Sequence, residues 1–370
     1  MIAGARLWVD DDVMANALVK RVGEIQSTPH RLFFDELANQ RFAWLARRTC
    51  AIPKLAAAYS VKTNPRTELL AAAKRYGLLA EVISDGELER ARAQSFGANS
   101  IIYNGPRPLR GTKVYCAFAD SPEAYDSYVA ANLADVLGAR YRPSEIESRF
   151  GMTGDQLAEC AQIARADVRV EAIGLSFHVR PQDFKGRTWY EIATEALDAA
   201  KRFQCAAAKP LQVLDIGGGW TPDGLENAFA NDLPRFVKAA RGSLASLEQV
   251  VIEPGQSLVT PCEAVAARIL EVRRRADQPE AIVDAGYPDF PQVRSFDHRT
   301  FYLAGAKAVR LARGRWQIGG PTCLEYDIVA DGVDLPEQAK AGDLVFVCDC
   351  GAYDASTAFD FAQGVRSRIS

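Results

Sequence analysis

The sequence contains few of the residues that build metal centres and disulfide frameworks. It has only three histidines in 370 residues, and its eight cysteines are scattered, without a Cys-x-x-Cys pair or a compact cluster of cysteine and histidine. Structural zinc sites and small disulfide-rich domains depend on such clusters. We therefore expect no metal site and reduced thiols, as is typical of a cytoplasmic protein.

Strong net charge and long apolar runs are also missing. The formal net charge is −3, so bulk attraction to nucleic acid or to an anionic membrane is not expected. No apolar run approaches the roughly 18–20 residues that a membrane span needs. The stretch MIAGARLWVDDDV at the N-terminus has an acidic cluster where a signal peptide would have its apolar segment. These features argue against nucleic-acid and membrane partners.

What the sequence does have is a repeated alternation of two kinds of segment. Helix-like stretches such as RTELLAAAKRYG and WYEIATEALDAAKRF separate most of a series of short apolar runs. The runs are predicted as strands at residues 57–62, 80–84, 100–104, 114–118, 135–140, 172–178, 212–216 and 249–253. This alternation predicts a parallel sheet with helices outside it. About eight such units over roughly 200 residues match the size of a (β/α)8 barrel, with an open doubly wound sheet as the alternative.

The pattern changes after about residue 260. Short runs such as EAIVDAG, FYLAG and GDLVFVCDCGAY, with turn residues at close intervals, predict an antiparallel β domain. The stretch RLWVD near the start reads as a further strand of that domain. We therefore expect a barrel at residues 30–260 and a β domain built from residues 1–29 and 261–370. Within the barrel, GPRPLRGTKVYCAF at 105–118 leaves little room for a full helix between two strands.

Polar residues stand where the predicted barrel strands finish, which is where barrel enzymes place their functional groups. The residues at these ends are Lys62, Ser84, Asn104, Arg140, His178, Gly217, Gly218, Gly219 and Glu253. Each alone has a simpler interpretation: a strand-end lysine is usually a solvated rim residue, and a lone histidine is usually a hydrogen-bonded core residue. A buried lysine, however, must be paired or deprotonated. The joint occurrence of these residues favours a functional site.

The glycines of LDIGGGW at 214–220 have a clear physical use. Backbone N–H groups without side chains around them can close around an anion such as phosphate. The stretch is not the G-x-G-x-x-G of dinucleotide sites. A phosphate cradle together with a lysine suggests pyridoxal phosphate (PLP), held by a Schiff base and by its phosphate.

With these motifs the chain resembles the fold type III PLP-dependent decarboxylases, the family of ornithine, arginine and diaminopimelate decarboxylases. The segments that carry the resemblance run in family order from about residue 30 to 360: YSVKTN, EVISDGELERA, IIYNGP, SRFGM, GLSFHV, LDIGGGW, IEPG, DAGY, GGPTC and GDLVFVCDCGAYD. The resemblance implies a PLP-binding barrel of the alanine racemase-like type and a β domain made from both chain ends. It also implies a homodimer with shared active sites.

The resemblance assigns roles in binding the cofactor. Lys62 matches the Schiff-base lysine, and His178 matches the residue that stacks on the cofactor ring. The run Gly217–Gly219 matches the phosphate loop, and Tyr353 matches a tyrosine that also contacts the phosphate. Glu253 matches the carboxylate that faces the pyridine nitrogen.

Glu253 also bears on the type of reaction. A protonated ring can absorb the electron pair left by decarboxylation, and an acid opposite the nitrogen keeps that proton in place. The alanine racemases, which resemble this barrel, place a cation there. Glu253 therefore favours decarboxylation over a racemase or another PLP lyase.

Further matches concern the substrate and the partner subunit. Cys323 resembles the cysteine that the partner subunit inserts into the site, where it would deliver a proton to Cα. Asp284 matches a position that contacts the substrate, and Arg140 is included among the cofactor-binding residues because of its place at a strand end.

The sequence departs from the family pattern at three places. The histidine strand continues His178-Val179-Arg180-Pro181 where relatives have glycine and serine, and Gln256 stands where they have a phosphate-binding arginine. Either Arg180 replaces the lost charge, or the phosphate is held weakly. Leu324 follows the cysteine where ornithine and diaminopimelate enzymes have an acid that reads a distal amine.

These departures leave two sets of alternatives open. Either the substrate lacks a simple terminal amine, and is an amino-acid-like group on a carrier protein or peptide, or Glu325 has taken over the charge. A catalytically inactive regulatory homologue is the alternative from another class.

Overall fold

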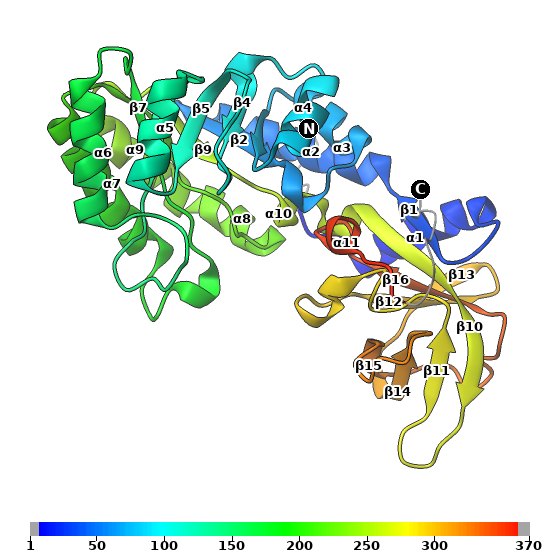
Figure 1. Ribbon diagram of the computed structural model, residues 1–370. Helices are drawn as coiled ribbons and strands as arrows, with labels where there is room; N and C mark the ends of the chain where they lie inside the picture. Colours follow the sequence, from blue (N-terminus) through cyan, green and yellow to red (C-terminus); the bar gives the residue numbers. More distant parts are fainter. Residues whose placement is uncertain (1–6, 362–370) are drawn as a thin grey trace. The chain divides into compact units, whose positions relative to one another are not determined.

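The computed structural model describes residues 7–361, whose contacts divide them into two compact units (Figure 1). The first unit comprises residues 39–258 together with Leu7, and the second comprises residues 8–38 and 259–361. The sequence pattern placed residues 30–38 with the barrel. In the structure, β1 (His30–Phe33) pairs instead with β10 (Glu263–Arg273), in the sheet of the second unit. The parts of the expected β domain at 1–6 and 362–370 lie outside the described residues.

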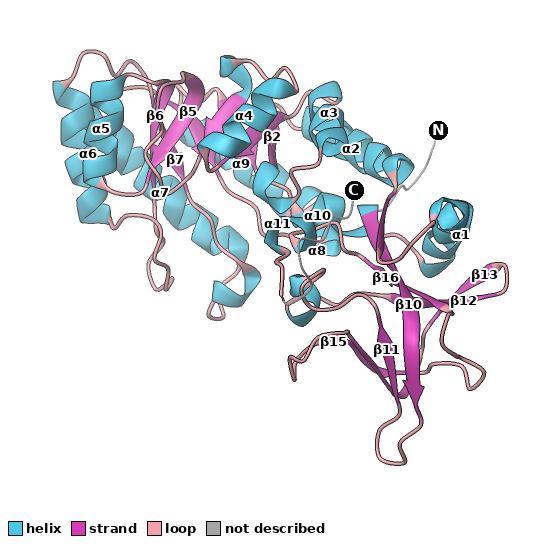
Figure 2. Cartoon of the chain, turned by 45° about the vertical axis from the view of Figure 1, so that its right-hand side comes forward, coloured by secondary structure: helices cyan, strands magenta, loops and turns pink. Residues whose placement is uncertain are grey.

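The first unit contains a closed barrel of parallel strands, as the alternation of segments predicts (Figure 2). Its strands are β2 (Leu55–Ser60), β3 (Leu79–Val82), β4 (Ile101–Tyr103), β5 (Val114–Ala119), β6 (Ala134–Arg140), β7 (Ile173–Ser176), β8 (Leu211–Asp215) and β9 (Gln249–Ile252). The ring closes because β2 pairs with both β3 and β9. The predicted barrel is therefore confirmed, the open doubly wound sheet is excluded, and every strand begins and ends within two residues of its predicted bounds.

Helices follow the strands along the chain, and several begin at a side-chain cap. They are α2 (Asp35–Cys50), α3 (Thr67–Arg75), α4 (Asp85–Ala93), α5 (Pro122–Ala131), α6 (Gly154–Ala166), α7 (Trp189–Ala207), α8 (Pro222–Ala230), α9 (Asp232–Ser243) and α10 (Gln256–Val259). Thr153 and Thr188 accept backbone N–H groups of the first turns of α6 and α7 in capping boxes, which satisfy otherwise unpaired donors. The segment 104–113 between β4 and β5 forms no helix, as its length predicts.

Apolar side chains fill the inside of the barrel up to the last residues of the strands. The buried cluster consists of Ala58, Ile102, Cys116, Phe118, Val136, Ala172, Val213 and Val251. Residues two apart on a strand share a face. The residues two positions after Ala58, Val213 and Val251 therefore also point inward, and all three are polar. They are Ser60, Asp215 and Glu253. The alternation of the strands thus places a polar layer on top of the apolar core.

The second unit is built on a sheet with the order β13-β12-β16-β10-β11-β14-β15, with β1 also paired to β10. Its further strands are β11 (Glu280–Val283), β12 (Thr300–Ala304), β13 (Lys307–Arg310), β14 (Arg313–Gly319), β15 (Ile328–Val333) and β16 (Leu344–Cys348). The predicted antiparallel pairing holds except that β11 and β14 are parallel. The β12–β13 hairpin lies between them in the chain and pairs at the far side of the sheet, and a connection of that length permits a parallel return.

The strand predicted for RLWVD is wrong. Residues 7–10 form no strand, and α1 (Asp11–Arg21) begins directly after them, with two aspartates in its first turn. Carboxylates are favourable at a helix N-terminus, so the acidic run starts a helix. Arg6 lies outside the described residues. The last helix of the unit is α11 (Asp354–Thr357).

Two observations bear on the expected class of protein. All eight cysteines are free thiols. Among the described residues, no helix has the length and apolar character required to cross a membrane.

Candidate active site

Lys62 has a buried counter-ion. It lies in a short 3-10 turn (Val61–Thr63) directly after β2, rather than within the strand. Its Nζ is 2.6 Å from Oε2 of Glu81, and the Ser60 hydroxyl donates to the same oxygen at 2.6 Å. Glu81 is fully buried, whereas 31% of the Lys62 side chain is exposed. The ammonium is therefore paired from below and reachable from solvent.

Glu253 follows β9 and faces Asn104. Its Oε1 accepts a hydrogen bond from Nδ2 of Asn104 at 3.1 Å. Burial raises the pKa of Glu253, and the nearby charge of Glu81 adds to this effect, while Lys62 and Asn104 oppose it. The carboxyl group is thus held in one orientation at the edge of the buried polar layer.

Asp215 is a second buried acid beside Glu253. It ends β8, and its Oδ1 accepts the backbone N–H of Gly217 at 2.8 Å. Burial raises the pKa of Asp215 well above its usual value, and Glu253 raises it further. The two acids therefore do not titrate as independent groups.

His178 has a fixed tautomer. Its Nδ1 accepts the backbone N–H of Gly218 at 3.2 Å, so the ring proton is on Nε2. Burial lowers the pKa of His178 to about 3, and the positive charges of Arg140 and Lys62 lower it as well. The imidazole is therefore neutral over the physiological range, which suits a flat ring that stacks on another ring.

The three glycines form a turn that other side chains could not adopt. Gly217 and Gly219 have φ of +70° and +91°, which lie in the left-handed region. A Cβ on Gly218 would lie 2.2 Å from the carbonyl oxygen of Glu253. The N–H groups of Gly217 and Gly218 are taken by Asp215 and His178. Of the three glycine N–H groups, only that of Gly219 has no acceptor among the described residues.

The two arginines expected near the cofactor have different surroundings. Arg140 ends β6 and stacks on Phe150, with its guanidinium carbon 4.9 Å from the ring centre. Arg180 forms two hydrogen bonds to Asp183, at 2.8 and 3.0 Å, and 57% of its side chain is exposed. Gln256 begins α10. Arg140 pairs across β6 and β7 with Ser176, two residues before His178, and Arg180 stands two residues after His178.

The cysteine loop expected to meet the substrate lies in the second unit, after β14. Asp327 shapes it: one carboxylate oxygen accepts the backbone N–H and hydroxyl of Thr322, and the other accepts the N–H of Tyr287. Cys323 and Glu325 are exposed on this loop. Glu325 also lines a cavity of about 750 Å³.

Asp284 and Tyr353, both expected in the site, are held within the second unit. Asp284 accepts the hydroxyl of Thr28 on one oxygen and the backbone N–H of Arg268 on the other. Tyr353 has φ of +67°, and its ring stacks on Phe296 at 6.4 Å. The sequence did not indicate these contacts, because each joins distant parts of the chain.

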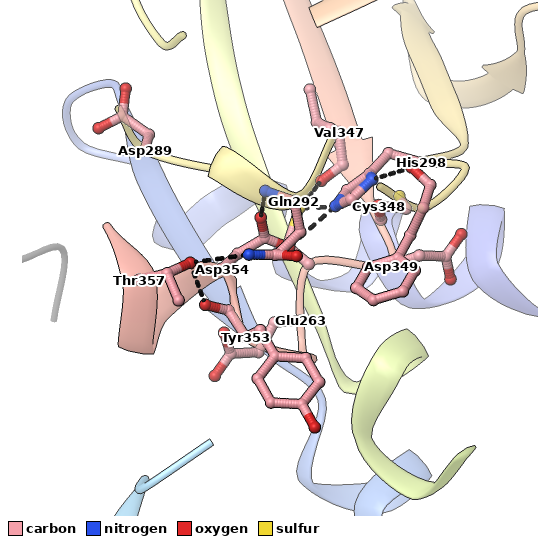
Figure 3. A network of polar contacts seen from close by, with 12 residues as sticks. Glu263, Asp289, Gln292, His298, Val347, Cys348, Asp349, Tyr353, Asp354 and Thr357 are labelled. Carbon is pink, nitrogen blue, oxygen red and sulfur yellow. Dashed lines mark hydrogen bonds and ion pairs between the residues drawn. The ribbon is translucent and has the colours of Figure 1, made fainter. Parts of the chain in front are cut away.

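A second cluster of polar side chains lies next to Tyr353 (Figure 3). The side chains of His298 and Asp354 are buried, as is Cys350, and the ligand-type atoms of the three residues lie within 4.8 Å of one another. His298 Nε2 is 2.8 Å from Asp354, and Nδ1 is 3.0 Å from the carbonyl of Phe296. Both ring nitrogens face acceptors, so the ring is a protonated partner of the Asp354 carboxylate. The Cys350 thiol donates to the carbonyl of Val347 at 3.1 Å.

The structure brings together Lys62, His178, Gly217–Gly219 and Glu253 at one end of the barrel, as the strand ends predict. The sequence analysis missed Glu81 and Asp215. The available signal was an acid inside each of two apolar strands, LLAEV and LQVLD. A buried acid needs a partner or a proton, which marks such positions for attention.

Known proteins share this sequence pattern and fold. The family model described as "Pyridoxal-dependent decarboxylase, C-terminal sheet domain" matches residues 82–351. A diaminopimelate decarboxylase of Deinococcus radiodurans is 27% identical, over 83% of this chain and 81% of that protein. An ornithine decarboxylase of Schizosaccharomyces pombe is 25% identical, over 91% and 82%. The L-glutamyl-[BtrI acyl-carrier protein] decarboxylase of Niallia circulans is 24% identical, over 94% and 88%.

Solved structures show the same fold. The lysine decarboxylase of Selenomonas ruminantium superposes with a TM-score of 0.77 at 22% identity, covering 96% of this chain and 94% of that one. The lysine/ornithine decarboxylase of Vibrio vulnificus, complexed with putrescine, gives a TM-score of 0.76 at 21% identity, covering 96% of each chain.

Proposed function

The chain belongs to the family of pyridoxal-dependent decarboxylases, and from this premise we propose that it removes the α-carboxyl group of an amino acid or amino-acid-like substrate, giving an amine and CO2. The observation that carries the proposal is the arrangement at the barrel mouth. A solvent-reachable lysine with a buried counter-ion, a neutral histidine, a glycine turn and a buried acid lie together there.

The residues present fit PLP. Lys62 would hold its aldehyde carbon, and the N–H of Gly219 would donate to its phosphate. A Cβ on Gly218 would clash with the carbonyl oxygen of Glu253, so the glycine allows the turn to lie against Glu253. Tyr353 and Arg180 are further phosphate ligands in this proposal, and the neutral ring of His178 would lie against the cofactor ring.

Each of these groups has a defined task in the reaction. Bound PLP supplies an aldehyde that links to amines and a ring that takes up the electron pair left at Cα when CO2 departs. Glu253 holds the proton on the ring nitrogen through a charge-assisted hydrogen bond, and Asn104 fixes the orientation of that carboxylate. The thiol of Cys323 delivers a proton to Cα as general acid.

The loop that carries Cys323 bears on the chemical group at the far end of the substrate. Leu324 cannot pair with an ammonium, and Glu325 is exposed and forms no ion pair with the described residues. We therefore favour a substrate whose far end is neutral, acidic or linked to a carrier. A relative named for a carrier-linked glutamyl substrate supports this choice. Relatives named for lysine, ornithine and diaminopimelate are the competing precedent.

The test is CO2 release by the purified protein supplied with PLP. The panel contains ornithine, lysine, diaminopimelate, glutamate and carrier-linked glutamate, and Lys62→Ala is the control. Release from one of them that Lys62→Ala abolishes supports the proposal. Binding of PLP without CO2 release from any of them, or turnover that only inverts Cα, contradicts it and points to a regulatory homologue or a racemase.

A homodimer with shared sites is also part of the proposal. Lys62 lies in the first unit and Cys323 in the second, so the two can come from different subunits. A mixture of Lys62→Ala and Cys323→Ala subunits should then recover about a quarter of wild-type activity, because half of the dimers are mixed and half of their sites are whole. Absence of recovery, with subunit exchange demonstrated by mass spectrometry, would mean that one chain builds each site.

A further inference from the structure

Two buried acids lie at neighbouring strand ends of the barrel mouth. Asp215 and Glu253 lie at the ends of the neighbouring parallel strands β8 and β9, and Asp215 is fully buried while Glu253 is 4% exposed. Each carboxyl group acts on the pKa of the other. A carboxylate has no hydrogen to donate, so a hydrogen bond between the two carboxyl groups requires a proton on one of them. Two ionised carboxylates at neighbouring positions in a buried site would repel each other.

The surroundings of the two acids differ. Glu253 receives a hydrogen bond from Asn104, and the positive charge of Lys62 favours its ionised form. Asp215 receives the N–H of Gly217 on Oδ1, but its Oδ2 is buried and receives no donor from the described residues. The charged groups that act on Asp215 are Glu253 and Glu81, both acidic.

The apolar residues next to Asp215 cannot stabilise a negative charge on it either. Two positions before it on the same strand face is Val213 of the buried core, and the thiol of Cys116 belongs to the same cluster. Burial raises the pKa of that thiol, and Asp215 raises it further, so Cys116 is a neutral neighbour. A proton on Asp215 therefore removes the costlier of the two buried charges.

We propose that Asp215 is a positioning residue: it carries a proton, donates a hydrogen bond to Glu253, and thereby keeps Glu253 ionised and aimed at the ring nitrogen of the cofactor. The role given to Glu253 rests on the proposed function. The proton on Asp215 does not, and it is present in the cofactor-free protein. Asp215, Glu253 and Asn104 then form one unit in which a carboxylate is oriented by two donors, one at the end of the neighbouring strand β8 and one directly after β4.

The proton can be observed without cofactor or substrate. Infrared difference spectra of the cofactor-free protein in D2O at pH 8.5 should show the carbonyl stretch of a protonated carboxyl group. Asp215→Asn should lose this band, and Glu253→Gln should keep it. Asp167→Asn, at a partly exposed aspartate ion-paired to Arg169, is the matched control and should also keep it. A band that survives in Asp215→Asn but is lost in Glu253→Gln would place the proton on Glu253 and overturn the proposal.

The positioning role is tested with the holoenzyme. Asp215→Asn preserves a donor of similar shape and should lose no more than about threefold in kcat. Asp215→Leu removes the donor and should lose on the order of 10²-fold in kcat with a smaller change in KM. The acid limb of the kcat–pH profile should shift in Asp215→Leu and remain in place in Asp215→Asn. Equal losses in both variants would mean that an ionised Asp215 is required.

The two kinds of measurement separate the possible failures. If Asp215→Leu does not fold, the infrared band and Asp215→Asn still decide the proposal. If no substrate is decarboxylated, the proposed function fails while the infrared result still assigns the proton. If the band is present but Asp215→Leu keeps full activity, the positioning role is refuted.

Discussion

Gly218→Ala adds one methyl group at a close approach between two barrel strand ends. The new Cβ would lie 2.2 Å from the carbonyl oxygen of Glu253, whereas ordinary contacts begin at 3.4 Å. The two backbones must therefore separate by roughly 1 Å. They cannot do so freely, because the N–H of Glu253 donates to the carbonyl of Gly217 at 2.7 Å, and the N–H of Gly218 donates to His178 at 3.2 Å.

The expected cost has a stability part and a rate part. Overpacking of this kind costs about 1–3 kcal/mol of unfolding free energy. Moving Glu253 by roughly 1 Å relative to the cofactor should lower kcat on the order of 10²-fold, because misplacement of that size spoils the orientation of a reacting group. We also expect weaker PLP binding, since the turn that would donate the N–H of Gly219 is displaced.

Gly242→Ala is the matched control. It makes the same substitution near the end of α9, where a Cβ would meet nothing within 4 Å, and should change stability by less than about 1 kcal/mol. The assays are urea unfolding of the cofactor-free protein, PLP titration by absorbance, and CO2 release. If Gly218→Ala matches Gly242→Ala in all three, the close approach to Glu253 does not constrain the site, and the reasoning is wrong.

The remaining predictions concern single positions. Glu253→Ala should still link PLP to the protein but lose most of kcat; unchanged kcat would remove its role at the ring nitrogen. For ornithine and lysine, Leu324→Asp should raise kcat/KM, since a missing charged partner costs about 2–5 kcal/mol, or roughly 30-fold to several thousand-fold. Efficient wild-type turnover of either diamine, lost in Glu325→Gln, would instead show that the neighbouring acid supplies the charge. Burial lowers the pKa of His298, but hydrogen bonds to its aspartate and cysteine neighbours outweigh this and raise it well above its usual value. The contribution of His298 to folding stability is therefore complete below about pH 6.5 and is lost as the pH rises through the pKa of His298 in the folded state. His298→Gln should cost about 3–5 kcal/mol in urea unfolding at pH 6 and less in alkaline buffer, and a cost that grows with pH would contradict the ion pair. Arg180→Gln should weaken PLP binding without changing the stability of the cofactor-free protein, and unaltered PLP affinity would exclude it from the phosphate site.

The barrel and the strand-end residues could be predicted because both follow from local patterns. A short apolar run followed by a turn residue marks the end of a buried strand, and this rule located Lys62, His178 and Glu253. The partners of these residues depend on register, which no local pattern gives. Ser60 and Glu81 are paired directly across β2 and β3, and this pairing delivers the acid to Lys62.

The strand predicted at RLWVD shows the opposite limit of local patterns. Three apolar residues between two charged ones also fit the extended chain that leads into a helix. The deciding feature is the acidic run after it, which starts α1 at Asp11. β1 shows a related limit. The sequence of its four residues does not indicate to which unit they belong, and only the pairing with β10 places them in the second unit.

The pairing of Arg180 with Asp183 is compatible with a role at the phosphate. Exposed ion pairs are worth about 0.2–1 kcal/mol, because water screens them and ordering two side chains costs entropy. Charge-assisted bonds from a guanidinium to a phosphate are stronger, especially beside an N–H donor such as that of Gly219. Gln256 supplies no positive charge. In the proposed site, Gln256 would therefore leave the phosphate without a guanidinium, and Arg180, two residues after His178, would supply one by giving up a weak surface pair.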